Sequence, residues 1–417
     1  MLKLSCLPIL LLYITGIVSA QPANDTKAAH ELLEKTRTAT RSEFQQAKAS
    51  KAAIVKRMLD LGLWKEATDA LKADKGLTAA EKSLLWAEYH WLINDFKAAE
   101  KDVTTALTAN KNSTWGKRLK ALLAIEAWDL QNAEKQCKQL LAANPNDDET
   151  AIVLGRALML QKKYPEALSV AQTLQKKNPK LAAAYQLEAN VYFWDQHPDK
   201  AEAPLVKSLT LDPLNADARF SYGYAIWRRV DATQLNDMAA QWQLALAINP
   251  LHFQTHWHWG NGHTNLTFAD YADKNEKEIR EKLREADKLF HDKRLADAVA
   301  VTYKIEKEYP SSVLPAMHRG SLYYSDFETP NRKANLDSAQ QTFVSILDKK
   351  KHYGPAHNGL SAVIKSKRIP YLMTYDSITN VLKTTKIKDP DNFANVFPDL
   401  SYFPGDRVKA MVWNQMY

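Results

Sequence analysis

The sequence has 417 residues, of which 45% are hydrophobic and 25% are charged, and 56 Lys and Arg against 48 Asp and Glu give a net charge of +8. This composition excludes a disordered or collagen-like chain, because it is too apolar and too rich in Trp and Tyr. The length allows two or three compact domains, or one elongated array of repeats.

The first twenty residues predict a secretory signal peptide. Lys3 precedes an apolar stretch at 7–18, which is shorter than the roughly 20 residues that a membrane-spanning helix needs. Small residues at 18–20 suit a cleavage site, and no later segment is apolar enough to cross a bilayer. We therefore expect cleavage after Ala20 and a secreted or periplasmic protein.

Cleavage would leave Cys137 as the one cysteine of the mature chain, and a single thiol cannot form an internal disulfide. Cys137 lies among Ala133, Leu140 and Leu141 at helical spacing. This pattern predicts a small buried apolar side chain rather than a reactive thiol.

From about residue 80 the same residue types return at a fixed step of 34 residues, which indicates internal repeats. The first series consists of small residues: Ala87, Ala121, Gly155, Ala189 and Gly223. The second series consists of alanines: Ala99, Ala133, Ala167 and Ala201. The third series consists of prolines that follow Asn or Asp: Pro145, Pro179 and Pro213. Apolar residues between these positions recur at three and four, so each period predicts two amphipathic helices.

The spacing has a physical reason. A small residue in the first helix and an alanine in the second allow two antiparallel helices to approach closely. The prolines end the second helix, because the residue before proline is pushed out of helical geometry. One such hairpin cannot bury its apolar face alone, whereas stacked neighbours can.

These three series, together with the Tyr-Pro-Glu-Ala at 164–167, resemble the tetratricopeptide repeat (TPR) pattern over most of the mature chain. The resemblance implies an all-α fold, a superhelical solenoid of antiparallel helix pairs. Strict units are expected at 80–113, 114–147, 148–181 and 182–215. A degenerate unit precedes them, and the unit from 216 reaches its proline three residues late, so we expect an insertion around 230–236.

The repeat register breaks between Gly260 and Ile279, where charges alternate densely and a long solvated helix is expected. Beyond Arg368 the pattern disappears. The expected organisation is a signal peptide at 1–20, an N-terminal capping helix at 21–47, an N-terminal solenoid segment at 48–266, a TPR-like C-terminal segment at 267–368 and a non-repeat tail at 369–417.

Arrays of this kind bind partners on their concave face, which first-helix residues next to the small position line. Counting within units places there Arg118, Arg156, Asn190, Phe193, Trp194, Tyr224, Trp227, Arg228, Trp257 and Asn261, with Trp115 and Phe220 beside them. Trp, Tyr and Arg are favoured at protein interfaces because they give large contact areas and charge-assisted hydrogen bonds. The alternative is that the rings pack between neighbouring helices.

Four histidines, at 252, 256, 258 and 263, fall within twelve residues. On one helix His252, His256 and His263 would share a stripe, which is a possible metal face. No further ligand completes it, and Gly260 and Gly262 weaken the helix. We therefore predict no metal and no cofactor, and expect packed histidines instead.

No catalytic signature stands out, because the sequence lacks a Gly-x-Ser-x-Gly elbow, a Walker loop and a His-Glu-x-x-His zinc helix. The prediction is an exported, non-enzymatic scaffold for protein–protein interaction that holds a protein or peptide segment. The basic excess at 349–388 adds an anionic glycan or surface as a further candidate partner, and we predict that the protein does not bind nucleic acid. The alternative function is the repeat region of, or an accessory to, an exported zinc peptidase.

Overall fold

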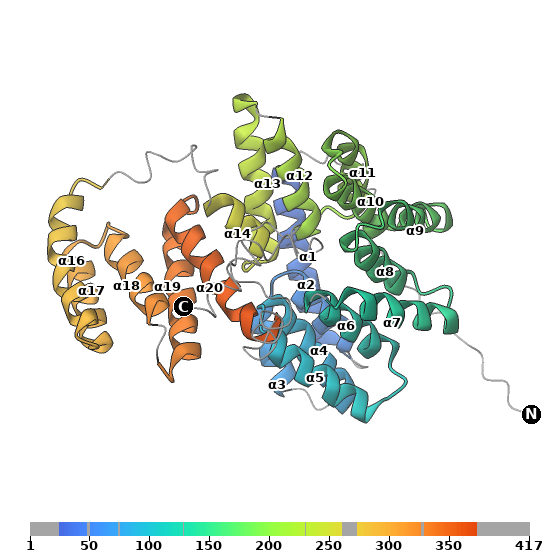
Figure 1. The fold of residues 1–417 in the computed structure, drawn as a ribbon, viewed down its shortest axis with the longest axis horizontal. Helices are drawn as coiled ribbons and strands as arrows, with labels where there is room; N and C mark the ends of the chain where they lie inside the picture. The colour runs from blue at the N-terminus through green and yellow to red at the C-terminus, as the bar shows by residue number, and fades with distance from the viewer. Residues whose placement is uncertain are drawn as a thin grey trace, which may run out of the picture.

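The computed structural model describes residues 25–47, 51–73, 76–127, 129–229, 231–260, 273–326 and 329–372. The predicted signal peptide, Asn261, His263 and the tail from 373 onward lie outside these ranges. Within them the regular elements are α-helices and one 3₁₀ turn, η1 (Ala232–Gln234), with no strand (Figure 1). The all-α prediction is confirmed.

The first segment consists of antiparallel helix pairs, which we number as units one to six, preceded by α1 (Thr26–Gln46). The pairs are α2 (Ala52–Asp60) and α3 (Trp64–Ala73), α4 (Ala79–Leu92) and α5 (Phe96–Ala109), α6 (Thr114–Glu126) and α7 (Leu130–Ala143), α8 (Asp148–Leu160) and α9 (Tyr164–Lys177), α10 (Ala182–Trp194) and α11 (Pro198–Leu211), and α12 (Ala216–Arg228) and α13 (Leu235–Ile248).

The second segment contains α14 (Phe253–Gly260), α16 (Glu276–His291), α17 (Leu295–Glu308), α18 (Leu314–Ser325), α19 (Arg332–Lys349) and α20 (Gly354–Leu372). Here α16 packs on α17, and α18 packs on α19. The short α14 packs mainly against α20, which is far from it in the sequence. Among the described helices, none combines the length and apolar character needed to cross a bilayer.

The repeated alanines sit where the two helices of each unit meet. Ala133, Ala167 and Ala201 are completely buried, as the predicted close approach requires. Each of these second helices ends at the Asn or Asp that precedes a repeated proline, as predicted. The side-chain oxygens of Asn144, Asn178 and Asp212 each accept a hydrogen bond from the backbone N–H two residues later at 3.2 Å, which turns the chain into the next unit.

The turn inside several units uses a left-handed residue that is not glycine. Asn94, Lys162, Gln196 and Lys293 have φ between 60° and 64°. Non-glycine residues adopt this conformation at a steric cost. No glycine in the sequence marks these turns, so the helix pattern alone indicates them.

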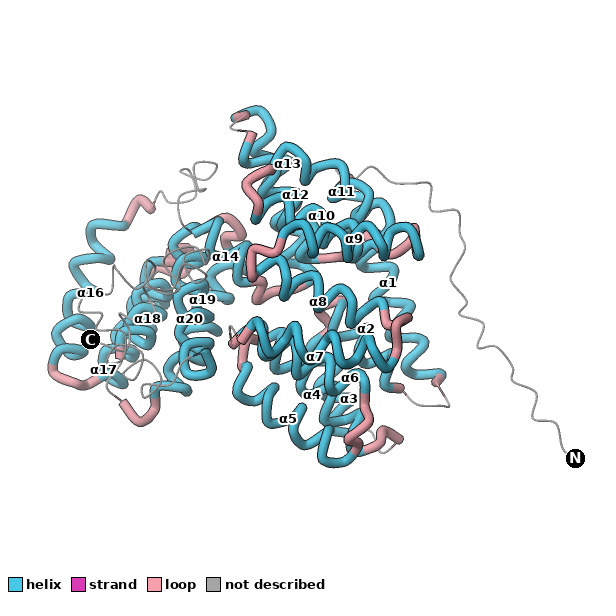
Figure 2. The backbone as a smooth tube through the Cα atoms, turned by 45° about the vertical axis from the view of Figure 1, so that its right-hand side comes forward, coloured by secondary structure: helices cyan, strands magenta, loops and turns pink. Residues whose placement is uncertain are grey.

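The first helices form the inner layer of the stack, because α4 contacts α6, α6 contacts α8, and α8 contacts α10. The path curves until the sixth unit returns toward the first, and α1 bridges the two by packing on both α2 and α13 (Figure 1). In Figures 1 and 2, α16 to α19 stack to one side of this curved segment. The predicted binding residues within the described ranges lie on these first helices and on α14.

Candidate protein-binding surface

Aromatic side chains gather where α10, α12 and α14 meet. We call Phe193, Phe220, Tyr224, Trp227, Trp257 and His258 the aromatic cluster. The Phe193 and Tyr224 rings meet edge to face at 5.6 Å, and Tyr224 stacks on Trp227 at 5.6 Å. His258 lies 4.9 Å from Tyr224 and 4.7 Å from Trp257, measured between ring centroids. All six side chains are half-buried, so each keeps part of its surface accessible.

The cluster is built by helical spacing on α12. Phe220, Tyr224 and Trp227 follow at i, i+4 and i+7, so they lie along one face of that helix. Behind them the fully buried Trp242 of α13 stacks on Phe220, and its indole N–H donates to the Phe220 carbonyl at 3.2 Å. Gly223 makes room for that ring. The row of aromatics is therefore fixed from behind.

The predicted arginines of units three and four are held by ion pairs between neighbouring units. The Arg118 guanidinium lies 3.3 Å from Asp147 and also pairs with Glu149. The Arg156 Nη2 atom lies 2.7 Å from the buried carboxylate of Glu126. These ion pairs tie the first helices of neighbouring units together.

The remaining predicted residues have mixed placements. The Asn190 side-chain oxygen accepts a long hydrogen bond of 3.4 Å from the Ser221 hydroxyl, next to the cluster. Trp194 packs into the core around Ala167, Leu187 and Val191. Arg228 is exposed at the end of α12. The structure thus brings Phe193, Tyr224, Trp227 and Trp257 together, whereas Arg118, Arg156 and Trp194 serve packing between units.

Comparison with known proteins identifies the repeat. The family model described as "Tetratricopeptide repeat" matches residues 124–191, which run from the end of α6 into α10. This match, the 34-residue period and the paired helices agree. Residues 124–191 match the tetratricopeptide repeat, and the chain has the all-helical repeat fold of such proteins.

Several solved structures are similar to this chain at low sequence identity. The chain is 22% identical to TTC0263, a thermophilic TPR protein of Thermus thermophilus, over 42% of this chain and 94% of that one, with a TM-score of 0.37. It is 13% identical to the Cut9–Hcn1 structure over 94% of this chain and 71% of that one, with a TM-score of 0.46. It is 17% identical to YrrB, whose structure is described as that of a TPR protein with an unusual peptide-binding site. The match covers 46% of this chain and 95% of that one, with a TM-score of 0.26. No curated protein matches the chain.

Of the three histidines considered as a metal face, His252 and His256 lie against different partners, and His263 lies outside the described residues. The His252 Nε2 atom lies 2.7 Å from Asp217, whereas the His256 Nδ1 atom lies 2.9 Å from that of His357. The two imidazoles therefore turn to different partners inside the TPR core. Within the described ranges, no three His, Cys, Asp or Glu side chains are grouped so that they could hold a metal ion.

His258 belongs to the cluster although the sequence analysis did not place it there. It was considered only beside possible metal ligands. Its ring reaches Phe220, Tyr224 and Trp227 because α14 packs across the end of the sixth TPR unit. The three-residue insertion in that unit shifts the register, so the repeat period alone could not locate it.

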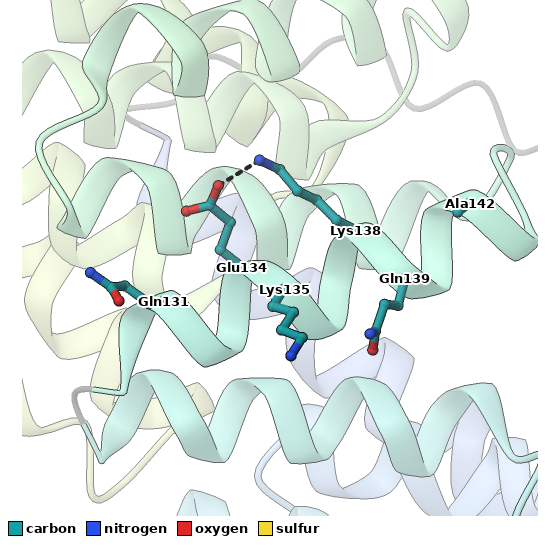
Figure 3. Close-up of a pocket in the computed structure, with 6 residues that line it drawn as sticks. All are labelled: Gln131, Glu134, Lys135, Lys138, Gln139 and Ala142. Carbon is teal, nitrogen blue, oxygen red and sulfur yellow. Dashed lines mark hydrogen bonds and ion pairs between the residues drawn. The ribbon is translucent and has the colours of Figure 1, made fainter.

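A shallow depression of about 490 Å³ lies along α7 (Figure 3). Gln131, Glu134, Lys135, Lys138, Gln139 and Ala142 line it, all from one second helix. Hydrogen bonds from Lys138 at 2.6 Å and Lys163 at 2.8 Å hold the pKa of Glu134 at about 2. Its charge is thus satisfied within the TPR stack, and nothing in the depression points to a ligand.

Of the basic residues predicted at 349–388, those that the structure describes are spread over both ends of α20, and those beyond 372 lie outside the described ranges. Lys349 lies 3.5 Å from Glu306, and Lys367 lies 2.5 Å from Asp337. Arg368 donates to the Asn94 side chain at 2.8 Å. These three cations are paired inside the TPR protein, and binding of an anionic glycan or surface stays a prediction.

Proposed function

We propose that this TPR protein is a scaffold that binds a segment of a partner protein through the aromatic cluster. The observation that supports the proposal is the continuous row of half-buried rings on α10, α12 and α14. Rings fixed from behind lose little conformational freedom when a partner covers them, so they give contact area at low entropic cost.

The chemistry of the partner follows from the surface. The rings favour an apolar or aromatic side chain that packs on or between them. Exposed Arg228 at the end of α12 offers a guanidinium to an acidic side chain or a carboxylate. We therefore expect a peptide segment that carries an apolar anchor near an acidic group.

Export is the second part of the proposal. It rests on the sequence of residues 1–20, with its apolar stretch followed by small residues. The proposed place of action is thus outside the cytoplasmic membrane, in the periplasm or the medium. N-terminal sequencing of the protein purified from its host tests this part, and a mature N-terminus at Gln21 is the expected result.

Selection from a peptide display library on the wild-type chain tests the binding proposal. Selected peptides should bind Tyr224→Ala and Trp227→Ala at least tenfold more weakly, since interface aromatics are frequent hot spots. Tyr185→Ala is the matched control, because Tyr185 lies on α10 and its hydroxyl bonds to the Pro179 carbonyl at 3.2 Å. Equal binding to all three variants would remove the cluster from the proposed function.

A further inference from the structure

Arg37 of the helix α1 donates hydrogen bonds to both the first and the sixth unit. The Arg37 Nε and Nη2 atoms donate to the Leu61 carbonyl at 2.9 and 2.8 Å, and Nη2 also donates to the Ala247 carbonyl at 2.7 Å. Leu61 caps the C-terminal end of α2, and Ala247 lies in the last turn of α13. Both helix ends carry unpaired carbonyls and partial negative charge, which a guanidinium satisfies.

The backbone around Arg37 is shaped to receive it. Gly62 follows Leu61 with φ of 73°, a conformation that favours glycine. A Cβ atom there would lie 2.5 Å from the Ile248 carbonyl oxygen and 3.1 Å from the Arg37 Nη2 atom. Any side chain at this position would push apart α1, α2 and α13.

The apolar part of the contact is small. Ala29 and Leu33 pack into one core with Leu61, Leu244 and Ile248, and Phe44 packs at its edge. Buried residues of the 21-residue α1 are Ala29, Leu33 and Thr40, while most of its other side chains are polar and exposed or half-buried. The helix α1 thus binds to the rest of the chain as an amphipathic helix binds in a groove. The contact is made by a stripe of side chains at helical spacing.

We propose that the seat of α1, formed by the α2–α3 turn and the end of α13, is a helix-binding site that α1 occupies within its own chain. A partner helix competes for the seat when it carries an arginine with a leucine four residues before it, an alanine eight before it and an aromatic residue seven after it. This spacing repeats Ala29, Leu33, Arg37 and Phe44. This helix-binding site is separate from the aromatic cluster, so an experiment can disprove binding at one site without disproving binding at the other.

Binding of a fluorescent peptide with the sequence of residues 25–47 to the full chain tests the proposal. In Leu33→Asp/Arg37→Ala the chain's own α1 no longer fits, so the free peptide should bind this variant at least tenfold more tightly than the wild type. The same peptide with Arg37→Ala should not bind. The proposal is overturned if the peptide binds the wild type and the double variant equally. It is also overturned if the peptide does not bind the double variant although that variant keeps the helix content of the wild type.

A second measurement needs no variant. Hydrogen exchange of the wild-type chain should show that α1 amides open at lower free energy than those of α12 and α13, as release from the seat requires. Exchange of α1 only through global unfolding overturns the proposal. Concentration-dependent dimerisation that Leu33→Asp abolishes also overturns it, because it assigns the seat to α1 of a second copy.

Discussion

His256 and His357 face each other in the core, with their Nδ1 atoms 2.9 Å apart. Each Nε2 atom lies 2.9 Å from a backbone carbonyl, that of Pro250 for His256 and that of Lys351 for His357. The ring centroids are 5.1 Å apart, so the rings meet nearly end to end. This pair joins α14 to α20, two helices of the second segment that lie far apart in the sequence.

Stability should fall in mild acid because of this pair. Burial lowers the pKa of His256 to about 4 and the pKa of His357 well below its usual 6.5, and neighbouring His252 and His352 oppose further charge. The unfolded chain takes up protons near pH 6.5, while the folded pair resists them down to about pH 4. Between these values the unfolded state binds more protons, so stability is lost as the pH falls, by about 3 kcal/mol for His256.

Urea midpoints from pH 7.5 to 4 measure this effect. The variant His256→Asn/His357→Asn should lose less stability on acidification than the wild type, although it starts lower at pH 7.5. His291→Asn is the control, since His291 is exposed on α16. A variant with the same pH slope as the wild type would contradict the assignment.

Gly223→Ala should destabilise the fold more than Gly155→Ala. A Cβ at 223 would lie 2.5 Å from the Nε1 atom of Trp242, a fully buried ring held by its bond to Phe220. A Cβ at 155 would overlap a terminal methyl of Leu187, which can rotate away. We expect a loss of about 1–3 kcal/mol at 223 and less at 155 in chemical denaturation. A larger loss at 155 than at 223 would contradict this prediction, because it would mean that Leu187 adjusts less readily than Trp242.

Arg368 should contribute more to stability than Lys333, although both reach the α4–α5 turn. Arg368 donates to Asn94 and lies over the rings of Phe253 and Phe96 at 4.7 and 5.1 Å. Burial lowers its pKa to about 10, so it stays charged at neutral pH. Arg368→Ala should cost about 1–3 kcal/mol, since packing and a charge-assisted bond are lost. Lys333→Ala, which removes an exposed pair with Asp95, should cost below about 1 kcal/mol; equal losses would contradict this contrast.

Cys137 should be unreactive in the native protein. Its side chain is completely buried, and burial raises the pKa of the thiol to about 12, so little thiolate forms. Ellman's reagent should leave the thiol of the folded mature chain unmodified and should label it after unfolding in guanidinium. Rapid modification of the folded protein would place Cys137 at an accessible surface.

The sequence was informative where neighbouring units repeat one contact. Ala133, Ala167 and Ala201 predicted the helix pairs, and Asn144, Asn178 and Asp212 marked the ends of second helices, because each unit must satisfy the same geometry. The aromatic residues of α10 and α12 were also predicted, because they lie next to the repeated small residue of each first helix. Local spacing encodes all of these features.

Contacts between distant parts of the chain carry no such signal. Nothing in the spacing relates Arg37 to Ala247, or His256 to His357, because each pair meets only after several units have stacked and curved. The pairing of Arg118 with Asp147 was missed for a related reason. A cation beside the small position is the same in sequence whether it faces a partner or the next unit.

Hydrogen exchange of the wild-type chain with a peptide from the display selection tests the central claim most directly, because it locates the bound surface. Binding through the aromatic cluster predicts slowed exchange in α10, α12 and α14 and unchanged exchange in α7. Slowed exchange confined to α7 or to α16–α19, with α10, α12 and α14 unchanged, would contradict it.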